Sequence, residues 1–364
     1  MLLLSNRIYR LIFSIALVFS TSANAGLYGF SEVNTLPPSP KIDVPPRYIT
    51  NYRKDMRDLI ISLSKYGKSR NKNFQTLIHE GQYLLDKSIW EYHRENYNNI
   101  RNQKSPINDS SFLADDITES AEEINYINSY ISEIDGIIVN NHYCQKHPIS
   151  NTISEENIPV FSIEQCSNKQ SLDDAISQSL VNNTIIYPFI NKDNAFKKTK
   201  HQLIINENAN NINQASQAKN ISFILNSSSF TNHQQMIDDI RNSNYDIVII
   251  KPVFNDLSPF SAEEVHSMKF KKNGAKRLII AIYNISELSN NSYLWQKEWE
   301  EKQPDWLLSS SQTRDNAYIV KYWTNEWKLL VSKYFKSIID SNYDGVFFTG
   351  LENHRYFENE LPLE

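Results

Sequence analysis

The chain of 364 residues has little of several features that would assign a function directly. Its net charge is only −5 at neutral pH, which is too mild to favour a nucleic-acid partner. It has two cysteines, Cys144 and Cys166, enough for one disulfide that the sequence alone neither assigns nor excludes. Its N-terminal apolar run, LIFSIALVF, is shorter than the about 20 residues that span a bilayer. The composition therefore predicts a globular protein with no retained membrane span.

Signatures of metal and dinucleotide binding are also missing. The segment NNHYCQKH brings His142, Cys144 and His147 close together, but their spacing does not match the paired ligands of zinc sites and is more typical of a loop. No G-x-G-x-x-G follows any of the expected strands. We therefore predict neither a metal nor a cofactor.

The N-terminus has the three parts of a secretory signal peptide. A basic segment, MLLLSNRIYR, precedes the apolar run, and SANAG supplies an A-x-A cleavage signal. We predict that residues 1–25 are removed on export to the periplasm or the medium. Residues 26–46 end in the proline-rich TLPPSPKIDVPP, which is typical of an extended arm, and residues 47–364 form the folded domain.

Eight short β-branched or aromatic runs recur along the folded part. They are apolar throughout rather than alternating, as parallel strands covered on both faces must be. Helix-like stretches lie between them, so the pattern predicts an α/β fold, a single (β/α)8 barrel, rather than an open doubly wound sheet. The runs are TLIHE from Thr76, IDGIIVN from Ile134, PVFSIEQ from Pro159, TIIYPFI from Thr184, ISFILN from Ile221, DIVIIKP from Asp246, RLIIAIYNI from Arg277 and DGVFFTG from Asp344.

Two helices are indicated by apolar residues at spacings of three and four. The first stripe lies in DMRDLIISLSKYGKS and the second in EWKLLVSKYFKSIIDS. PDWLLSS near Trp306 could add a ninth strand, and the asparagine-rich segments 98–111 and 206–220 are typical of surface loops. The stripes consist of Met56, Leu59, Ile60 and Leu63, and of Trp327, Leu330, Tyr334 and Ile338.

In such a barrel the chemistry lies at the carboxyl ends of the strands. Carboxylates and aromatics gathered there suit a sugar, because aromatic faces stack on pyranose rings and carboxylates serve as acid and base. Residues just after strands are also common helix caps, and tryptophans commonly pack helices onto a barrel. The polar candidates are Glu80, Asn140, Glu164, Lys251, Asp256, Glu287, Thr349 and Glu352, and the aromatic candidates are Tyr283, Trp295, Tyr322 and Trp323.

Three segments resemble the extracellular endo-α-1,4-polygalactosaminidase family of glycoside hydrolases, some members of which have been mislabelled as cysteinyl-tRNA synthetases. They are YDIVIIKPVFNDLSPFSAEEVHSMKFKKNGAKRLIIAIYNISEL, SYLWQKEWEEKQPDWLL and YIVKYWTNEWKLLVSKYFKSIIDSNYDGVFFTGLENHRYFE. The family pattern of Tyr-Trp-x-x-x-Trp, Pro-x-Trp, Tyr-Trp-x-x-x-Trp and Asp-Gly-Val is nearly complete, with Leu294 in place of the first tyrosine. Upstream segments resemble those that follow Asp-Gly-Val in the family, so the resemblance implies a circularly permuted barrel.

The departures from the family bear on activity. Lys251, Thr349 and Asn140 stand where the resemblance implies carboxylates, and only Glu287 remains of a Gly-Glu-Ala-Glu motif. Glycoside hydrolysis normally needs two carboxyl groups, which a lysine or threonine cannot replace.

Two functions remain open, both for an exported protein that is expected to be a monomer. One is a glycoside hydrolase acting on amino-sugar polymers, with Glu287 as general acid and Glu352, Asp256 or Glu164 as its partner. The other is a catalytically degenerate barrel that binds polysaccharide or serves in interactions. In that second case the binding residues would be Trp295, Trp299, Tyr322 and Trp323, and Lys251 would favour an acidic sugar or pair with Glu287.

Overall fold

A computed structural model describes residues 49–102, 121–190, 195–199, 204–310 and 316–359. The expected signal peptide, residues 1–25, and the expected arm, residues 26–46, lie outside these ranges. Within the described part, no helix is long and apolar enough to cross a membrane.

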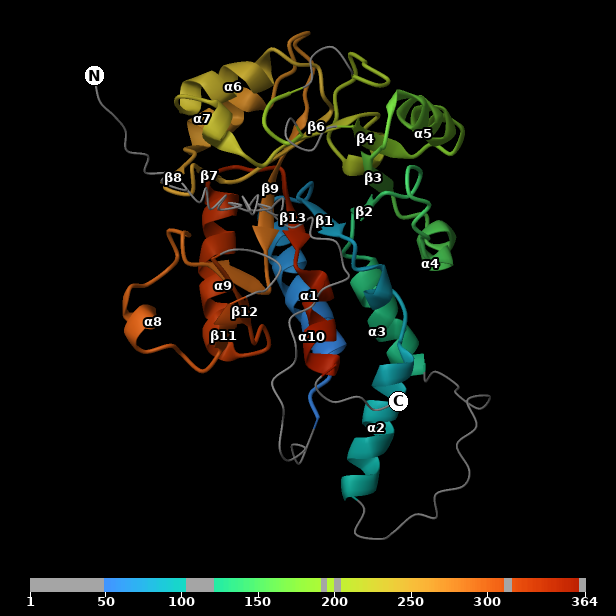
Figure 1. Ribbon diagram of the computed structural model, residues 1–364, viewed down its shortest axis with the longest axis vertical. Coiled ribbons are helices and arrows are strands. Elements are labelled where there is room, and N and C mark those ends of the chain that lie inside the picture. Colours follow the sequence, from blue (N-terminus) through green and yellow to red (C-terminus); the bar gives the residue numbers. More distant parts are fainter. Residues whose placement is uncertain (1–48, 103–120, 191–194, 200–203, 311–315, 360–364) are drawn as a thin grey trace, which may run out of the picture.

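The centre of the fold is a sheet of eight parallel strands in the order β4-β3-β2-β1-β13-β9-β6-β5 (Figure 1). All eight predicted runs are confirmed as these strands, which curl into a nearly closed α/β barrel. β1 pairs with β13 as well as with β2, so the first and last of these strands along the chain are neighbours in the sheet, as a circular permutation requires. The permutation itself stays a prediction. The strands are β1 (Gln75–His79), β2 (Gly136–Asn140), β3 (Val160–Gln165), β4 (Ile185–Phe189), β5 (Ile221–Ile224), β6 (Ile247–Ile250), β9 (Leu278–Asn284) and β13 (Gly345–Thr349).

The barrel is completed by side chains where β4 meets β5. These two edge strands lie close together, but no strand ladder joins them among the described residues. Phe196 fills the seam: its N–H donates to the Tyr187 hydroxyl, and its carbonyl accepts from the N–H groups of Leu225 and Asn226. The ring is fully buried and packs edge-on to Phe223. Phe196 adopts a left-handed backbone (φ 62°), a strained conformation that these contacts hold in place.

Strand residues divide between two apolar layers by alternation. On β1, Leu77 belongs to the cluster inside the barrel and Ile78 to the cluster under the helices, and Phe347 and Phe348 divide in the same way on β13. Both layers are buried, which is why the strands have no alternating polar face.

The two predicted helical stripes correspond to α1 (Tyr52–Arg70) and α9 (Asn325–Asp340). The Asn51 side chain caps α1 by accepting from the Lys54 N–H, and all four predicted apolar residues of α1 are buried. On α9 the buried face is rotated from the prediction. It consists of Trp327, Val331, Phe335 and Ile338, whereas Leu330 and Tyr334 are only partly buried.

Most of the remaining helices surround the barrel, whereas α8, which has no buried residue, lies on a projecting segment, and two small antiparallel sheets accompany the barrel (Figure 1). PDWLLSS contributes β11 to a sheet of order β10-β12-β11 and is not a ninth barrel strand. The other strands are β7 (Val253–Phe254), β8 (Ser258–Pro259), β10 (Glu287–Ser289), β11 (Leu307–Ser310) and β12 (Ala317–Val320). The other helices are α2 (Ile89–Asn102), α3 (Ala121–Ile131), α4 (Asn151–Glu155), α5 (Lys169–Val181), α6 (His233–Arg241), α7 (Ala262–Met268), α8 (Glu298–Glu301) and α10 (His354–Glu358), with short 3-10 turns at Gln82–Leu84, Ala215–Gln217, Ser227–Ser229 and Leu351–Asn353.

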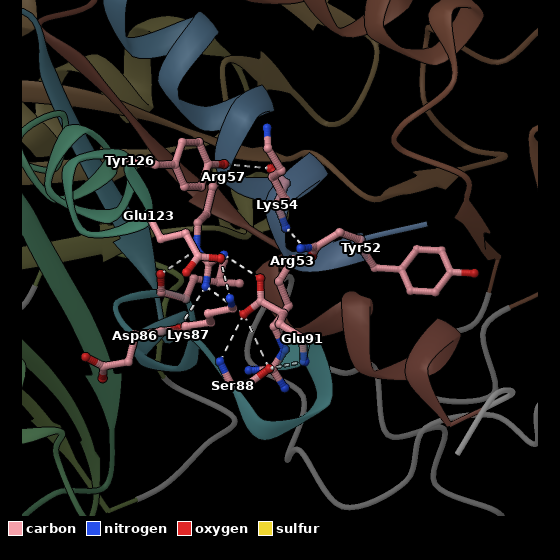
Figure 2. Close-up of polar contacts among 12 residues, drawn as sticks. Tyr52, Arg53, Lys54, Arg57, Asp86, Lys87, Ser88, Glu91, Glu123 and Tyr126 are labelled. Carbon is pink, nitrogen blue, oxygen red and sulfur yellow. Dashed lines mark hydrogen bonds and ion pairs between the residues drawn. The ribbon is translucent and has the colours of Figure 1, made fainter. Parts of the chain in front are cut away.

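A buried ion pair ties α1 to the segment after β1 (Figure 2). Arg57 binds both oxygens of Glu91 at 2.7 and 3.2 Å and also donates to the carbonyls of Leu84 and Asp86. Because both ionic side chains are almost fully buried, this pair fixes how α1 meets α2.

The asparagine-rich segment 206–220 is more than the predicted surface loop. Ile212, Ala215 and Ala218 are buried in the cluster inside the barrel, and the Ala215 N–H donates to the side chain of Gln75, the first residue of β1. The segment therefore packs against the amino-terminal end of the barrel. Of the other segment, 98–111, residues up to Asn102 belong to α2 and the rest lie outside the described residues.

Candidate functional site

A pocket of about 390 Å³ opens at the carboxyl ends of β6, β9 and β13. Lys251 follows β6, and Asn284 and Thr349 end β9 and β13. Each lies two positions beyond a residue of the interior cluster, so strand alternation directs all three toward the barrel mouth. Asp256 and Glu287, from the segments after β6 and β9, also line the pocket. Four of the predicted polar residues therefore meet in one place, together with Asn284.

Lys251 and Asp256 form an ion pair on the pocket wall, with Nζ 2.9 Å from Oδ1. Asp256 lies in the turn of the β7–β8 hairpin, where it and Asn255 both have left-handed backbones (φ 60° and 48°). The Ser227 hydroxyl bonds the Asn255 side chain and accepts from its N–H, which anchors the turn to the segment after β5. The hairpin thus brings a carboxylate to the lysine.

Glu287 is positioned by Asn284. The Asn284 Nδ2 group donates to Glu287 Oε2 at 3.0 Å, while Asn284 Oδ1 accepts from the backbone N–H groups of Ser286 and Glu287. Glu287 begins β10, whose pairing with β12 holds the backbone in place. Sequence reasoning missed Asn284, although its position at the end of β9 with inward parity was a signal for it.

Thr349 is almost fully buried at the pocket floor. The next residue, Gly350, has a left-handed backbone (φ 84°), and an added Cβ would collide with Asn284 Oδ1 and Ser286 Oγ. The Ser286 hydroxyl donates to the Gly350 carbonyl at 2.6 Å. Thr349 therefore supplies shape where the family resemblance implies a carboxylate.

The pocket has an aromatic side between β9 and α9. Tyr283 belongs to the cluster under the helices, with its ring 4.6 Å from that of Tyr334 at an interplanar angle of 69°. Tyr293 lies 5.6 Å from Tyr334 and is partly exposed. Of the predicted aromatic residues, Tyr283 is the one that lines the pocket.

Glu164, within β3, does not line the pocket and is fully buried. Its oxygens accept from the backbone N–H groups of Tyr143 and Cys144 and from the Ser162 hydroxyl. Cys144 and Cys166 form a disulfide beside it, which closes the alternative left open by the sequence. In the disulfide, Cys144 has no free thiol that could bind a metal together with His142 and His147. Among the described residues, no group of three or more His, Cys, Asp or Glu side chains is placed to hold a metal ion.

Glu352 and Glu80 interact electrostatically outside the pocket, just beyond the ends of the neighbouring strands β13 and β1. Glu80 accepts from the Asn140 N–H at 2.8 Å, and Glu352 accepts from the Gly81 N–H at 3.1 Å and pairs with Arg355 at 3.1 Å. Burial, and next the charge of Glu352, raise the pKa of Glu80 to about 7. Burial also raises the pKa of Glu352. These two carboxylates join strand ends to each other.

Asn140 ends β2 and points its amide at His79 on β1, with Nδ2 3.0 Å from Nε2. Burial lowers the pKa of His79 to about 4, so the imidazole is neutral at physiological pH. His79 was not predicted, although it precedes Glu80 with inward parity. Neither Asn140 nor His79 lines the pocket.

The other predicted aromatic residues pack between elements, and their predicted placement at the mouth is corrected. Tyr322 is fully buried and donates to the Tyr52 carbonyl at 2.9 Å, and Trp323 packs on Tyr52 and Phe357. Trp295 stacks near Tyr318 on β12, away from the pocket lining. These rings attach helices and the side sheet to the barrel, because apolar contact area is what an aromatic ring supplies best.

Comparisons with known proteins give distant relatives. No model of a known protein family matches the chain. An uncharacterized protein of Methanocaldococcus jannaschii is 30% identical over 175 residues, which are 46% of this chain and 49% of that protein. Uncharacterized proteins of Thermotoga maritima and Deinococcus radiodurans are 27% and 23% identical over 124 and 126 residues, covering 34% and 35% of this chain and 37% and 39% of theirs. The chain thus spans about half or less of the length of these curated relatives, whose names state no activity.

Proposed function

We propose that the protein is an exported barrel that binds an amino-sugar polymer in the pocket at the carboxyl end of the barrel. The observation that carries the proposal is the pocket lining, which joins Asp256, Glu287 and Lys251 to three tyrosines. Aromatic faces and paired carboxylates are the groups that hold sugar rings and their hydroxyls. Two carboxylates against one lysine leave an excess negative charge, which attracts a polymer carrying free amines along its length. The sequence resemblance to polygalactosaminidases supports the same ligand class.

Export is part of the proposal. The signal-peptide pattern of residues 1–25 supports it, and so does the Cys144–Cys166 disulfide, because disulfides persist in oxidising compartments.

Hydrolysis is the second candidate, favoured by the presence of both Glu287 and Asp256 in one pocket. In this reaction Glu287 protonates the glycosidic oxygen as the C–O bond breaks. Asp256 takes a proton from the water that adds to the anomeric carbon. Glu352 and Glu164 no longer compete for the second role, since neither lines the pocket. Two features favour binding without turnover. Asp256, the second carboxylate, is held in an ion pair with Lys251, and Thr349 supplies no carboxylate.

The test combines binding with release of reducing ends from galactosamine-containing and acidic polysaccharides. We expect the folded protein to bind the amino-sugar polymers, and Glu287→Gln to abolish any turnover while retaining binding, because glutamine can still accept from Asn284. Glu155→Gln, an exposed position on α4, is the matched control and should behave as wild type. A folded protein that binds none of these polymers would contradict the proposed function.

A further inference from the structure

The aromatic side of the pocket is lined by three tyrosines, which we call the tyrosine compartment: Tyr283, Tyr293 and Tyr334. Its members come from β9, from the segment after β10 and from α9. Tyr334 contacts both of the others, with ring centroids at 4.6 and 5.6 Å. Leu288, Leu294 and Trp327 continue the apolar lining beside them. The polar side of the pocket, with Lys251, Asp256 and Glu287, is thus continuous with the tyrosine compartment.

The hydroxyl of Tyr283 is the unusual group in this compartment. It is buried and has no hydrogen-bond partner among the described residues, although the side chain lines the pocket. Buried hydroxyls are nearly always paired, and an unpaired one costs folding free energy. Burial, and then the nearby Tyr293, raise the pKa of Tyr283 well above its ordinary value, so its O–H stays neutral and able to donate. A ligand with a carbonyl acceptor would complete it.

The chemistry of the compartment favours a neutral group with an apolar end. Three phenol rings provide faces for a methyl group, and the Tyr283 hydroxyl provides one donor. An ammonium group would lose its hydration there, at a cost that tyrosine side chains without negative charge repay only in part.

We propose that the tyrosine compartment takes the N-acetyl group of an N-acetylhexosamine unit, with the Tyr283 hydroxyl donating to the acetamide carbonyl. The inference rests on the proposed function and names the sugar unit that the pocket selects from an amino-sugar polymer. Free-amine units then lie outside the compartment, along the rest of the bound chain.

The experiment measures affinities of the full mature chain, by calorimetry, for two matched galactosamine oligosaccharides, one fully N-acetylated and one with free amines. The Tyr283→Phe variant removes one oxygen and keeps the ring. Tyr343→Phe is the matched control, because that hydroxyl is also buried without a partner among the described residues but does not line the pocket.

We expect the wild type and the Tyr343→Phe control to bind the N-acetylated oligosaccharide about tenfold more tightly than the free-amine one. Tyr283→Phe should weaken binding of the N-acetylated oligosaccharide by about tenfold, the effect of one neutral hydrogen bond, and leave binding of the free-amine oligosaccharide unchanged. Equal affinities of the wild type for both, tighter binding of the free amine, or no selective effect of Tyr283→Phe would overturn the inference while leaving polymer binding intact. Absence of binding to both would instead overturn the proposed function itself, and the inference with it.

Discussion

Replacement of Glu80 by glutamine tests whether the buried charge of Glu80, near that of Glu352, destabilises the fold at neutral pH. Burial of the Glu80 carboxyl, and next the charge of Glu352, raise the pKa of Glu80 from 4.5 to about 7. Glutamine keeps an oxygen that accepts from the Asn140 N–H, and its amide carries no charge to repel Glu352. Residue 80 has a left-handed backbone (φ 53°), which glutamate and glutamine tolerate equally, so the substitution adds no backbone strain.

The sign follows from which state holds the proton. Below pH 4.5 the carboxyl is protonated in both the folded and the unfolded chain, so it does not affect stability. Between pH 4.5 and about 7 the folded state keeps a proton that the unfolded state has released, so the free energy of unfolding falls as the pH rises. The difference of about 2.5 pKa units, at about 1.4 kcal/mol each, gives a loss of about 3 kcal/mol above pH 7.

Urea unfolding at a series of pH values measures this loss. We expect Glu80→Gln to match the wild type near pH 4.5 and to be more stable by about 3 kcal/mol at pH 8. The control Glu155→Gln, at an exposed position, should follow the wild type at every pH. A constant difference between Glu80→Gln and the wild type across this range would refute the assignment of the buried carboxyl pair.

Two further predictions concern cross-links of the fold. Removing the disulfide in a Cys144→Ala, Cys166→Ala variant should lower the free energy of unfolding by about 3 kcal/mol, because the bond closes a loop with a sequence separation of 22; urea unfolding of the variant under non-reducing conditions measures this, and an unchanged midpoint would contradict it. Arg57→Met should cost about 3–5 kcal/mol, since it leaves the Glu91 carboxylate buried without its cation, whereas Arg57→Met with Glu91→Leu should cost clearly less. Guanidinium unfolding of the single and double variants decides, and equal losses would show that the ion pair is not what holds the two side chains.

The strands were predictable because each is apolar over its full length and bounded by polar turns, which few structures other than a covered parallel strand require. α1 was predicted with its buried residues because its stripe is uninterrupted. On α9 the prediction chose Tyr334 over Val331, because both lie near the apolar face and only packing against β9 and the side sheet decides between them. The segment 206–220 was misjudged because its many asparagines hide the three apolar residues that enter the barrel end.

The sequence predicted where the candidate site lies, but not which residues line it. Strand parity accounts for Lys251 and Thr349 at the mouth, but Asp256 reaches the pocket only through the hairpin turn that returns it to Lys251. Glu164, like Glu287, is an acidic residue near a strand end, and the sequence does not distinguish them. In the structure Glu164 faces the helix side of β3, where its oxygens accept from backbone N–H groups.

The sequence by itself determined the eight parallel strands, their order along the chain and the polar residues that follow them, because those depend on local apolar runs and on the alternation of side chains. Only the tertiary structure decided which of these residues share a pocket, that Glu352 binds the segment after β1 while Glu80 binds the end of β2, and that Tyr283 lines the pocket although its hydroxyl is buried without a partner among the described residues. Those facts depend on contacts between segments far apart in the chain, whose geometry is set by packing and not by any local pattern.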